Sequence, residues 1–248
     1  MKRFVCMLLC LLSLCAACAQ AEIIFIYSEE ETAGEWTYPV PLSVLEDPMD
    51  VLRLINRENL LEKDYPDQSL DMYEMIPVTA PVTKGGFTLR PIVNDAMVDM
   101  LSAAEAEGIK LYVGSAYRNY RSQEVSHYNR VQELGEDDGI VQMAGASEHQ
   151  AGLAADVVSW AYRNKFQTSF GDTKEGQWLA ANCAQYGFII RYPENARDIT
   201  GIRYEPWHVR YVGVEAATYI MDSGLTLEEF TAEWQAELAE YERLGGAL

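Results

Sequence analysis

The chain has 248 residues, of which 49% are hydrophobic, and its 19 basic and 38 acidic residues give a formal net charge of −19. This length and composition are those of a soluble globular protein with room for one sizeable domain. A negative charge of this size argues against nucleic acid, or an anionic membrane surface, as the main partner.

The first 21 residues show the order of regions found in an export signal. Two basic residues precede an apolar run over residues 4–14, which is too short to cross a bilayer comfortably, and Ala-Gln-Ala at 19–21 fits a cleavage site. We therefore predict an exported, extracellular or cell-envelope protein whose mature form begins at Glu22 and has no integral membrane span. The alternatives are a retained anchor, a buried helix, or tethering through a lipid on Cys18, which follows two alanines.

Four of the five cysteines lie in this first segment, so Cys183 has no partner for an internal disulfide in the mature chain. Its apolar, helical surroundings predict a small buried side chain. Residues 22–50 are acidic and contain prolines, and we interpret them as a linker or N-terminal arm. We expect a folded domain over residues 51–234, a C-terminal helical tail over residues 235–248, and a monomer.

Within the domain, apolar periodicity switches repeatedly between helical and strand patterns. Helical patterns begin at Asn94, at Arg121, at Lys174 and after Thr226, and strand patterns cover residues 109–113, 153–158, 188–191 and 207–212. Asn94 is placed to cap the first helix, and Thr226 with Glu229 forms a capping box for the last. In the second helix we expect Val125, Tyr128 and Val131 to face inward. Because strands and helices mix without regular alternation, the fold class we predict is α+β.

Two of the three histidines lie in segments with an unusual arrangement of polar residues. The first segment, residues 147–156, reads SEHQAGLAAD, and it places His149 on a loop and Asp156 in an apolar strand. A buried carboxylate is costly unless it is paired or bound to a metal. His149 and Asp156 are therefore either metal ligands or a purely structural hydrogen-bonded pair.

The second segment, residues 205–211, reads EPWHVRY. Its proline favours extended backbone, which puts His208 near the start of a strand with Glu205 beside it. His149, Asp156 and His208 would give zinc three ligands and leave a fourth position for water, as in catalytic zinc sites. Zinc lowers the pKa of its bound water toward ~7, and Glu205 could take the proton as the water attacks.

The third segment, residues 115–123, reads SAYRNYRSQ and lies between a strand and a helix. Arg118 carries a fixed positive charge that could stabilise a developing oxyanion. Gln123 and Ser147 could donate hydrogen bonds to the terminal carboxylate of a substrate. The alternative is that such side chains cap the helix or line a solvated turn, which we prefer for Asn119 and Arg121.

Taken together, these segments resemble the zinc D-alanyl-D-alanine carboxypeptidases of the vancomycin-resistance Y type. The resemblance extends over about residues 52–232, and it rests on SAYR at 115–118, the segment 147–156, EPWHVRYVG at 205–213, LINREN at 54–59 and GFIIRYP at 187–193. It implies a compact domain with a central antiparallel sheet flanked by helices, related to L,D-carboxypeptidases and to lysostaphin- and hedgehog-type zinc domains. The residues that match the family's site are His149, Asp156 and His208 as ligands of one zinc ion, Glu205 as catalytic base, Arg118 as transition-state arginine, and Gln123 and Ser147 as substrate contacts.

We therefore predict a zinc metallocarboxypeptidase that removes the terminal D-alanine from peptidoglycan stem peptides, at either a D-Ala-D-Ala or an L,D bond. A dipeptidase acting on free D-Ala-D-Ala fits less well with export. A non-catalytic, zinc-stabilised module that binds wall peptides is the alternative from another class, although it would leave Glu205 without a use. Two histidines and one carboxylate suit zinc, but they would also hold other divalent ions.

Overall fold

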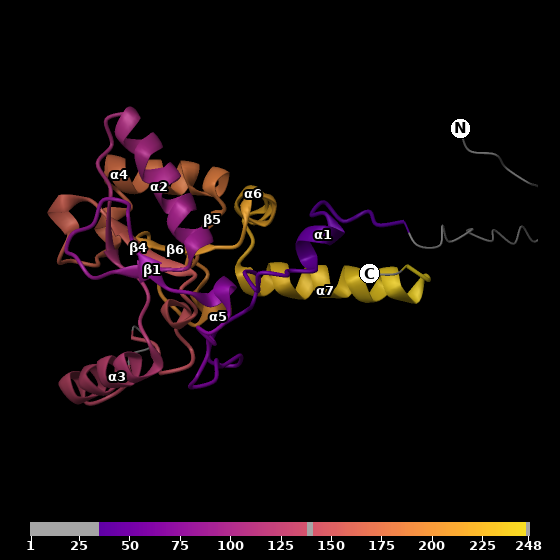
Figure 1. The fold of residues 1–248 in the computed structure, drawn as a ribbon, viewed down its shortest axis with the longest axis horizontal. Coiled ribbons are helices and arrows are strands. Elements are labelled where there is room, and N and C mark those ends of the chain that lie inside the picture. The colour runs from indigo at the N-terminus through magenta and orange to yellow at the C-terminus, as the bar shows by residue number, and fades with distance from the viewer. Residues whose placement is uncertain (1–34, 138–140, 247–248) are drawn as a thin grey trace, which may run out of the picture. The chain divides into compact units, whose positions relative to one another are not determined.

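Figure 1 shows the computed structural model of the chain, which describes residues 35–137 and 141–246. The predicted export signal and its four cysteines lie outside these described residues. The strands are β1 Ile76–Pro77, β2 Thr88–Leu89, β3 Tyr112–Ser115, β4 Ala154–Val158, β5 Phe188–Ile190 and β6 His208–Tyr211. The α-helices are α1 Leu42–Leu45, α2 Pro91–Ala106, α3 Tyr120–Leu134, α4 Lys174–Asn182, α5 Arg197–Thr200, α6 Val214–Ser223 and α7 Leu227–Arg243. Short 3-10 helices cover Asp71–Tyr73, Glu148–Ala151, Trp160–Tyr162, Thr168–Phe170 and Cys183–Tyr186.

An antiparallel sheet of four strands in the order β3-β4-β6-β5 lies at the centre of the fold. Side chains alternate between the two faces of a strand, and directly paired residues share a face. Asp156 and its partner His208 therefore lie on one face, whereas Ala155 and its partner Val209 lie on the other. The predicted α+β class with a central antiparallel sheet is confirmed.

The apolar face of the sheet packs against α2 and α4. Met97 and Met100 of α2 and Leu179 of α4 are buried in one hydrophobic cluster with Val157 and Val209. Figure 1 shows both helices on the same side of β4 and β6. Each large apolar side chain fully buried in this way contributes about 1.5–3 kcal/mol relative to exposure, so this face fixes the position of the opposite, polar face.

A second hydrophobic cluster lies beside the sheet, between α6, α7 and the start of the described chain. Ile220 of α6 and Phe230 of α7 are buried there with Tyr38, Val40 and Leu45. Part of the predicted N-terminal arm therefore packs on the domain, and α7 runs as one helix across residue 234. The domain boundaries themselves stay a prediction.

The helix starts follow the predictions in part. The capping box is confirmed, because the Thr226 hydroxyl accepts from the Glu229 N–H at 3.2 Å and the Thr226 N–H donates to the Glu229 carboxylate at 2.9 Å. The predicted cap at Asn94 is wrong. The helix begins earlier, at Pro91, which is well suited to the first helical position, and Asn94 instead accepts from the Thr79 N–H at 2.9 Å.

Helix α3 forms where it was predicted, but its inward face is not the predicted one. Val125 is 44% exposed and Tyr128 is 61% exposed, whereas Gln123 is buried. Figure 1 shows α3 lying apart from α2 and α4, the helices that cover the sheet. Asn119 caps this helix by accepting from the Ser122 N–H at 2.9 Å, in line with the structural role preferred for it.

Cys183 is buried and free, as predicted, directly after α4. Over the part of the chain that the structure describes, no helix combines the length and the apolar composition needed to span a membrane.

Candidate functional site

The predicted ligand His149 is carried by a short 3-10 turn that a glycine ends and two hydrogen bonds hold in place. Gly152 ends the turn with a φ of +68°, a backbone conformation that residues other than glycine rarely adopt. The fully buried Arg90 donates to the Ala151 carbonyl at 2.7 Å, and the His149 carbonyl accepts from the Arg118 N–H at 3.1 Å. These hydrogen bonds fix the position of the turn and, with it, the position of His149.

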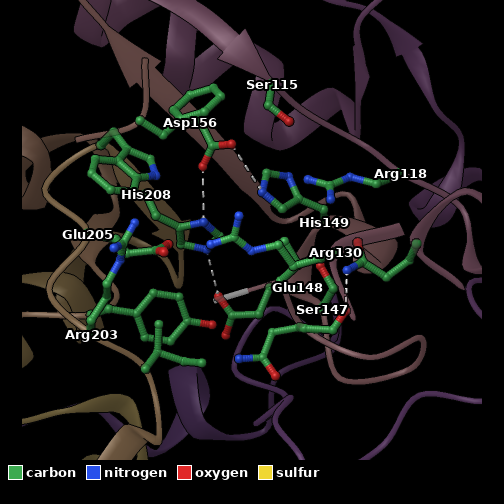
Figure 2. A pocket seen from close by; sticks show the side chains of 17 residues that line it. Ser115, Arg118, Arg130, Ser147, Glu148, His149, Asp156, Arg203, Glu205 and His208 are labelled. Carbon is green, nitrogen blue, oxygen red and sulfur yellow. Dashed lines mark hydrogen bonds and ion pairs between the residues drawn. The ribbon is translucent and has the colours of Figure 1, made fainter. Parts of the chain in front are cut away.

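The structure brings the three predicted metal ligands together. His149, Asp156 and His208 are buried and offer ligand atoms within 4.8 Å of one another. Asp156 Oδ1 lies 3.2 Å from His208 Nδ1, and Asp156 Oδ2 lies 3.5 Å from His149 Nε2, as Figure 2 shows. Ligand atoms around a tetrahedral ion with bonds of ~2.1 Å are roughly 3.4 Å apart. The spacing and the donor set therefore fit a zinc ion.

Each histidine has a further partner on its other ring nitrogen. His149 Nδ1 lies 2.8 Å from the Ala116 carbonyl oxygen. This nitrogen must carry the proton, because a carbonyl only accepts, and Nε2 then faces the cluster with its lone pair. His208 Nε2 lies 3.4 Å from Glu148 Oε2.

The charges in the cluster shift the titration of its members. Burial alone would raise the pKa of Asp156, but His149 and His208 hold that pKa well below its usual range. Burial disfavours a charged ring at His208, yet its hydrogen bonds to Asp156 and Glu148 outweigh that and raise its pKa to about 9. For His149, burial dominates and lowers the pKa. A metal that binds here therefore displaces a proton from His208.

The polar face of the sheet opens into a cavity of about 430 Å³ that contains every predicted site residue. Besides the three ligands, its lining includes Arg118, Gln123, Ser147 and Glu205. Glu205 is not part of the ligand cluster, but Figure 2 shows its carboxylate beside His208. Burial raises its pKa to about 7. Phe166 and Trp207, with ring centroids 5.9 Å apart, form an aromatic part of the wall.

Two further polar residues, Arg121 and His127, do not line this cavity. Arg121 pairs with Glu124, and its side chain is 79% exposed. His127 lies 3.5 Å from Asp137 and takes no part in the ligand cluster. For Arg121 this agrees with the structural role that the sequence analysis preferred.

Sequence reasoning missed a group of buried charges directly behind the ligands. The group consists of Glu148, Arg191 and Arg210, whose side chains are 0% exposed. Each of the two arginines forms an ion pair with Glu148. The available signal was the occurrence of arginines within the apolar strand segments FIIRY and HVRYV, since buried arginines are almost always paired. Their partner was not apparent because it precedes them by 43 and 62 residues.

The chain is similar in sequence to known carboxypeptidases. The family model of VanY, a D-alanyl-D-alanine carboxypeptidase, matches residues 86–214, which include all three ligands and Glu205. A putative carboxypeptidase of Bacillus subtilis (strain 168), YodJ, is 39% identical over 198 residues, covering 76% of this chain and 70% of that protein. The chain belongs to the VanY family. Because the members of this family are carboxypeptidases, this VanY-family chain is a carboxypeptidase.

Two solved structures are similar to this VanY-family chain. The LdcB LD-carboxypeptidase, described in terms of peptidoglycan recognition, is 38% identical with a TM-score of 0.68, covering 75% of this chain and 88% of that one. A vancomycin-resistance D,D-pentapeptidase VanY, a mutant in complex with Zn(II), is 32% identical with a TM-score of 0.58, covering 73% and 98%. The similar structures thus include one that holds zinc, and this chain has a three-residue donor set that fits the same ion.

Proposed function

We propose that this VanY-family chain uses one zinc ion, held by His149, Asp156 and His208, to remove the terminal D-alanine from peptidoglycan stem peptides. The observation that carries the proposal is the placement of a buried cluster of two histidines and one carboxylate beside Glu205 in a single cavity. Structural zinc sites have four protein ligands, whereas three ligands leave a position open for chemistry.

When bound, zinc supplies a Lewis acid that polarises the scissile carbonyl and makes water more acidic. Glu205 is the base in this proposal. It takes a proton from the attacking water and delivers that proton to the leaving amine of D-alanine. The burial that raises its pKa to about 7 makes its carboxylate a stronger base than an exposed glutamate.

The other polar residues of the cavity bind and orient the substrate in this proposal. Arg118 donates to the carbonyl oxygen as negative charge develops. Gln123 donates one amide N–H to the Gln142 carbonyl, which leaves its second N–H for the substrate's terminal carboxylate. Ser147, which also lines the cavity, donates its hydroxyl to the same carboxylate.

The reaction is tested by mass spectrometry of stem peptides incubated with the chain, with and without zinc. Three substrates separate the specificities: a pentapeptide stem ending in D-Ala-D-Ala, a tetrapeptide stem with an L-centre before D-Ala, and free D-Ala-D-Ala. Zinc-dependent loss of one D-alanine is the expected result, and the substrate consumed fastest assigns the bond. No cleavage by a folded, zinc-loaded sample would overturn the proposal in favour of a module that binds wall peptides.

The role of Glu205 is tested by Glu205→Gln, which keeps the size of the side chain and removes the base. We expect turnover to fall by ~10²–10⁴-fold while bound zinc is unchanged. Glu215→Gln changes an exposed glutamate in the first turn of α6 and serves as the matched control. Full turnover in Glu205→Gln would exclude the mechanism.

We also propose that the protein is exported and acts as a monomer in the cell envelope, with its catalytic domain over residues 51–234. Support comes from the signal-like order of residues 1–21 and from the peptidoglycan substrate itself. The intact mass of the protein recovered from cells tests export. A chain that begins at Glu22 supports cleavage, a lipid-modified Cys18 supports tethering, and an uncleaved cytoplasmic chain would overturn the proposal.

A further inference from the structure

Glu148 precedes His149 in the sequence, and its two carboxylate oxygens have different partners. Oε1 accepts from Arg191 Nε at 2.7 Å and from Arg210 Nη1 at 2.6 Å. Oε2 lies 3.4 Å from His208 Nε2, as the dashed line in Figure 2 marks. One oxygen is therefore occupied by two guanidinium groups, and the other is left for the histidine.

This arrangement determines which nitrogen of His208 can bind a metal. A carboxylate only accepts hydrogen bonds, so the Nε2 that faces Glu148 carries the ring proton. Nδ1 faces Asp156 at 3.2 Å, inside the ligand cluster, so it is the nitrogen that gives up its proton and offers a lone pair when a metal binds. At His149 the roles of the two nitrogens are reversed, because its Nδ1 donates to the Ala116 carbonyl.

We propose that Glu148 is a positioning residue for zinc, which holds His208 in the tautomer and orientation that present Nδ1 to the ion. This inference rests on the proposed zinc site at His149, Asp156 and His208. An outer carboxylate of this kind fixes the tautomer of a ligating histidine, and its loss typically weakens metal binding 10–100-fold.

Glu148 is itself held from several elements. Arg191 donates two further hydrogen bonds, at 2.8 and 2.7 Å, to Glu228 in the first turn of α7. Arg210 Nη2 donates to the carbonyls of Val51 and Arg53, both at 2.8 Å. The two arginines and two glutamates balance in charge, and these hydrogen bonds fix the Glu148 carboxylate behind His208.

Glu148→Gln tests the proposal because the amide can satisfy only one set of partners. The two arginines claim its single carbonyl oxygen, which turns the NH₂ group toward His208 Nε2. Two donors cannot pair, so Nε2 becomes the acceptor and the ring keeps its proton on Nδ1, which then has no lone pair for the ion. We expect zinc affinity, measured by competition with a chromophoric chelator, to fall at least ~10-fold.

Glu228→Gln is the matched control. It removes a carboxylate from the same buried charge group, but the hydrogen bonds of Glu228 run to Arg191 and Asn56, whereas His208 Nε2 faces Glu148. Both variants should unfold at a lower urea concentration when zinc-free, since each leaves a buried arginine short of a partner. Only Glu148→Gln should weaken zinc binding beyond ~3-fold. Equal losses of zinc affinity in the two variants would reduce Glu148 to a structural role and overturn the inference.

A spectroscopic readout separates this inference from the proposed function. The chain has three histidines, so nitrogen-15 NMR of the zinc-loaded protein resolves each ring. We expect protonated Nε2 at His208 and protonated Nδ1 at His149, with only the first changed by Glu148→Gln. A wild-type chain that binds no zinc would contradict the proposed function. A wild-type chain that binds zinc, with an unchanged His208 tautomer and affinity in Glu148→Gln, would overturn this inference alone.

Discussion

Asp156 and His208 are directly opposite partners on the antiparallel strands β4 and β6, and Asp156 Oδ1 lies 3.2 Å from His208 Nδ1. Strand pairing alone therefore brings two of the three proposed ligand side chains together, although they are 52 residues apart in sequence. The third ligand, His149, comes from a turn that Arg90 holds in place. A site built on paired strands is preorganised, and this favours tight and specific metal binding.

We expect Asp156→Asn to lose stoichiometric zinc. Both carboxylate oxygens of Asp156 face an imidazole nitrogen, and an amide brings neither the negative charge nor the second oxygen. The zinc content per chain, measured by plasma mass spectrometry after dialysis, should fall from one ion to a small fraction. Asp99→Asn, at an exposed position of α2, should keep one ion. Full zinc content in Asp156→Asn would contradict the ligand assignment.

Arg118→Met should lower kcat by ~10²–10³-fold, the usual effect of removing one oxyanion donor. Arg118 lines the cavity with its side chain, whereas its backbone N–H holds the turn that carries His149 and is unaffected by the substitution. Zinc content should therefore be unchanged. Arg121→Met removes an exposed arginine three residues away and is the control for a change of net charge. An unchanged kcat, or a loss of zinc in parallel with kcat, would contradict the proposed role of Arg118.

The elements predicted best are those whose signal is local. The capping box of Thr226 and Glu229 closes within one turn, and the apolar run at β4 needs only burial on both faces to be a strand. The predicted helix cap at Asn94 was wrong because residue types that cap helices also occur inside them. Only the tertiary structure shows that Asn94 binds Thr79. The prediction that Val125 and Tyr128 face inward was wrong because a helical period shows which residues share a face of the helix. It does not show whether another element covers that face.

The clustering of His149, Asp156 and His208 could be expected from the sequence because the chain has only three histidines and because each of these residues lies in a distinctive segment. The charge group behind it could not be predicted. Glu148 meets Arg191 and Arg210 only because β5, β6 and the 3-10 turn come together in the fold. Charged residues are numerous in the sequence, and nothing local distinguishes a buried pair from two solvated side chains.

Cys183 gives a prediction for the dependence of stability on pH. Burial raises the pKa of its thiol to about 12, from an ordinary value near 9, so the folded chain keeps a proton that the unfolded chain releases. Stability from this group is complete below about pH 9 and is lost as pH rises from there toward 12. The free energy of unfolding should therefore fall less steeply between pH 8 and 10 in Cys183→Ala than in the wild type.

The same burial should make Cys183 unreactive in the folded protein. A chain without residues 1–21 holds no other cysteine, so each modification detected by mass spectrometry reports on this thiol. Iodoacetamide at pH 9 should leave the folded chain unmodified and should label it fully in urea. Rapid labelling of the folded chain would show that the thiol is accessible and that its pKa is not raised.

Gly187 and Gly108 separate the effect of backbone conformation from that of crowding. Both have positive φ, +81° and +77°, so alanine at either position costs about 1 kcal/mol in backbone strain. A Cβ at Gly187 would lie 2.7 Å from Tyr211 Cε2, whereas nothing lies within 4 Å of a Cβ at Gly108. Crowding of this kind typically adds ~1–3 kcal/mol.

Gly187→Ala should therefore lower the free energy of unfolding by ~2–4 kcal/mol, and Gly108→Ala by only ~1 kcal/mol, in urea titrations of the zinc-free chain. Equal losses would mean that the Tyr211 ring moves aside without cost, and that the close approach of Gly187 to β6 does not constrain the pairing of β5 with β6.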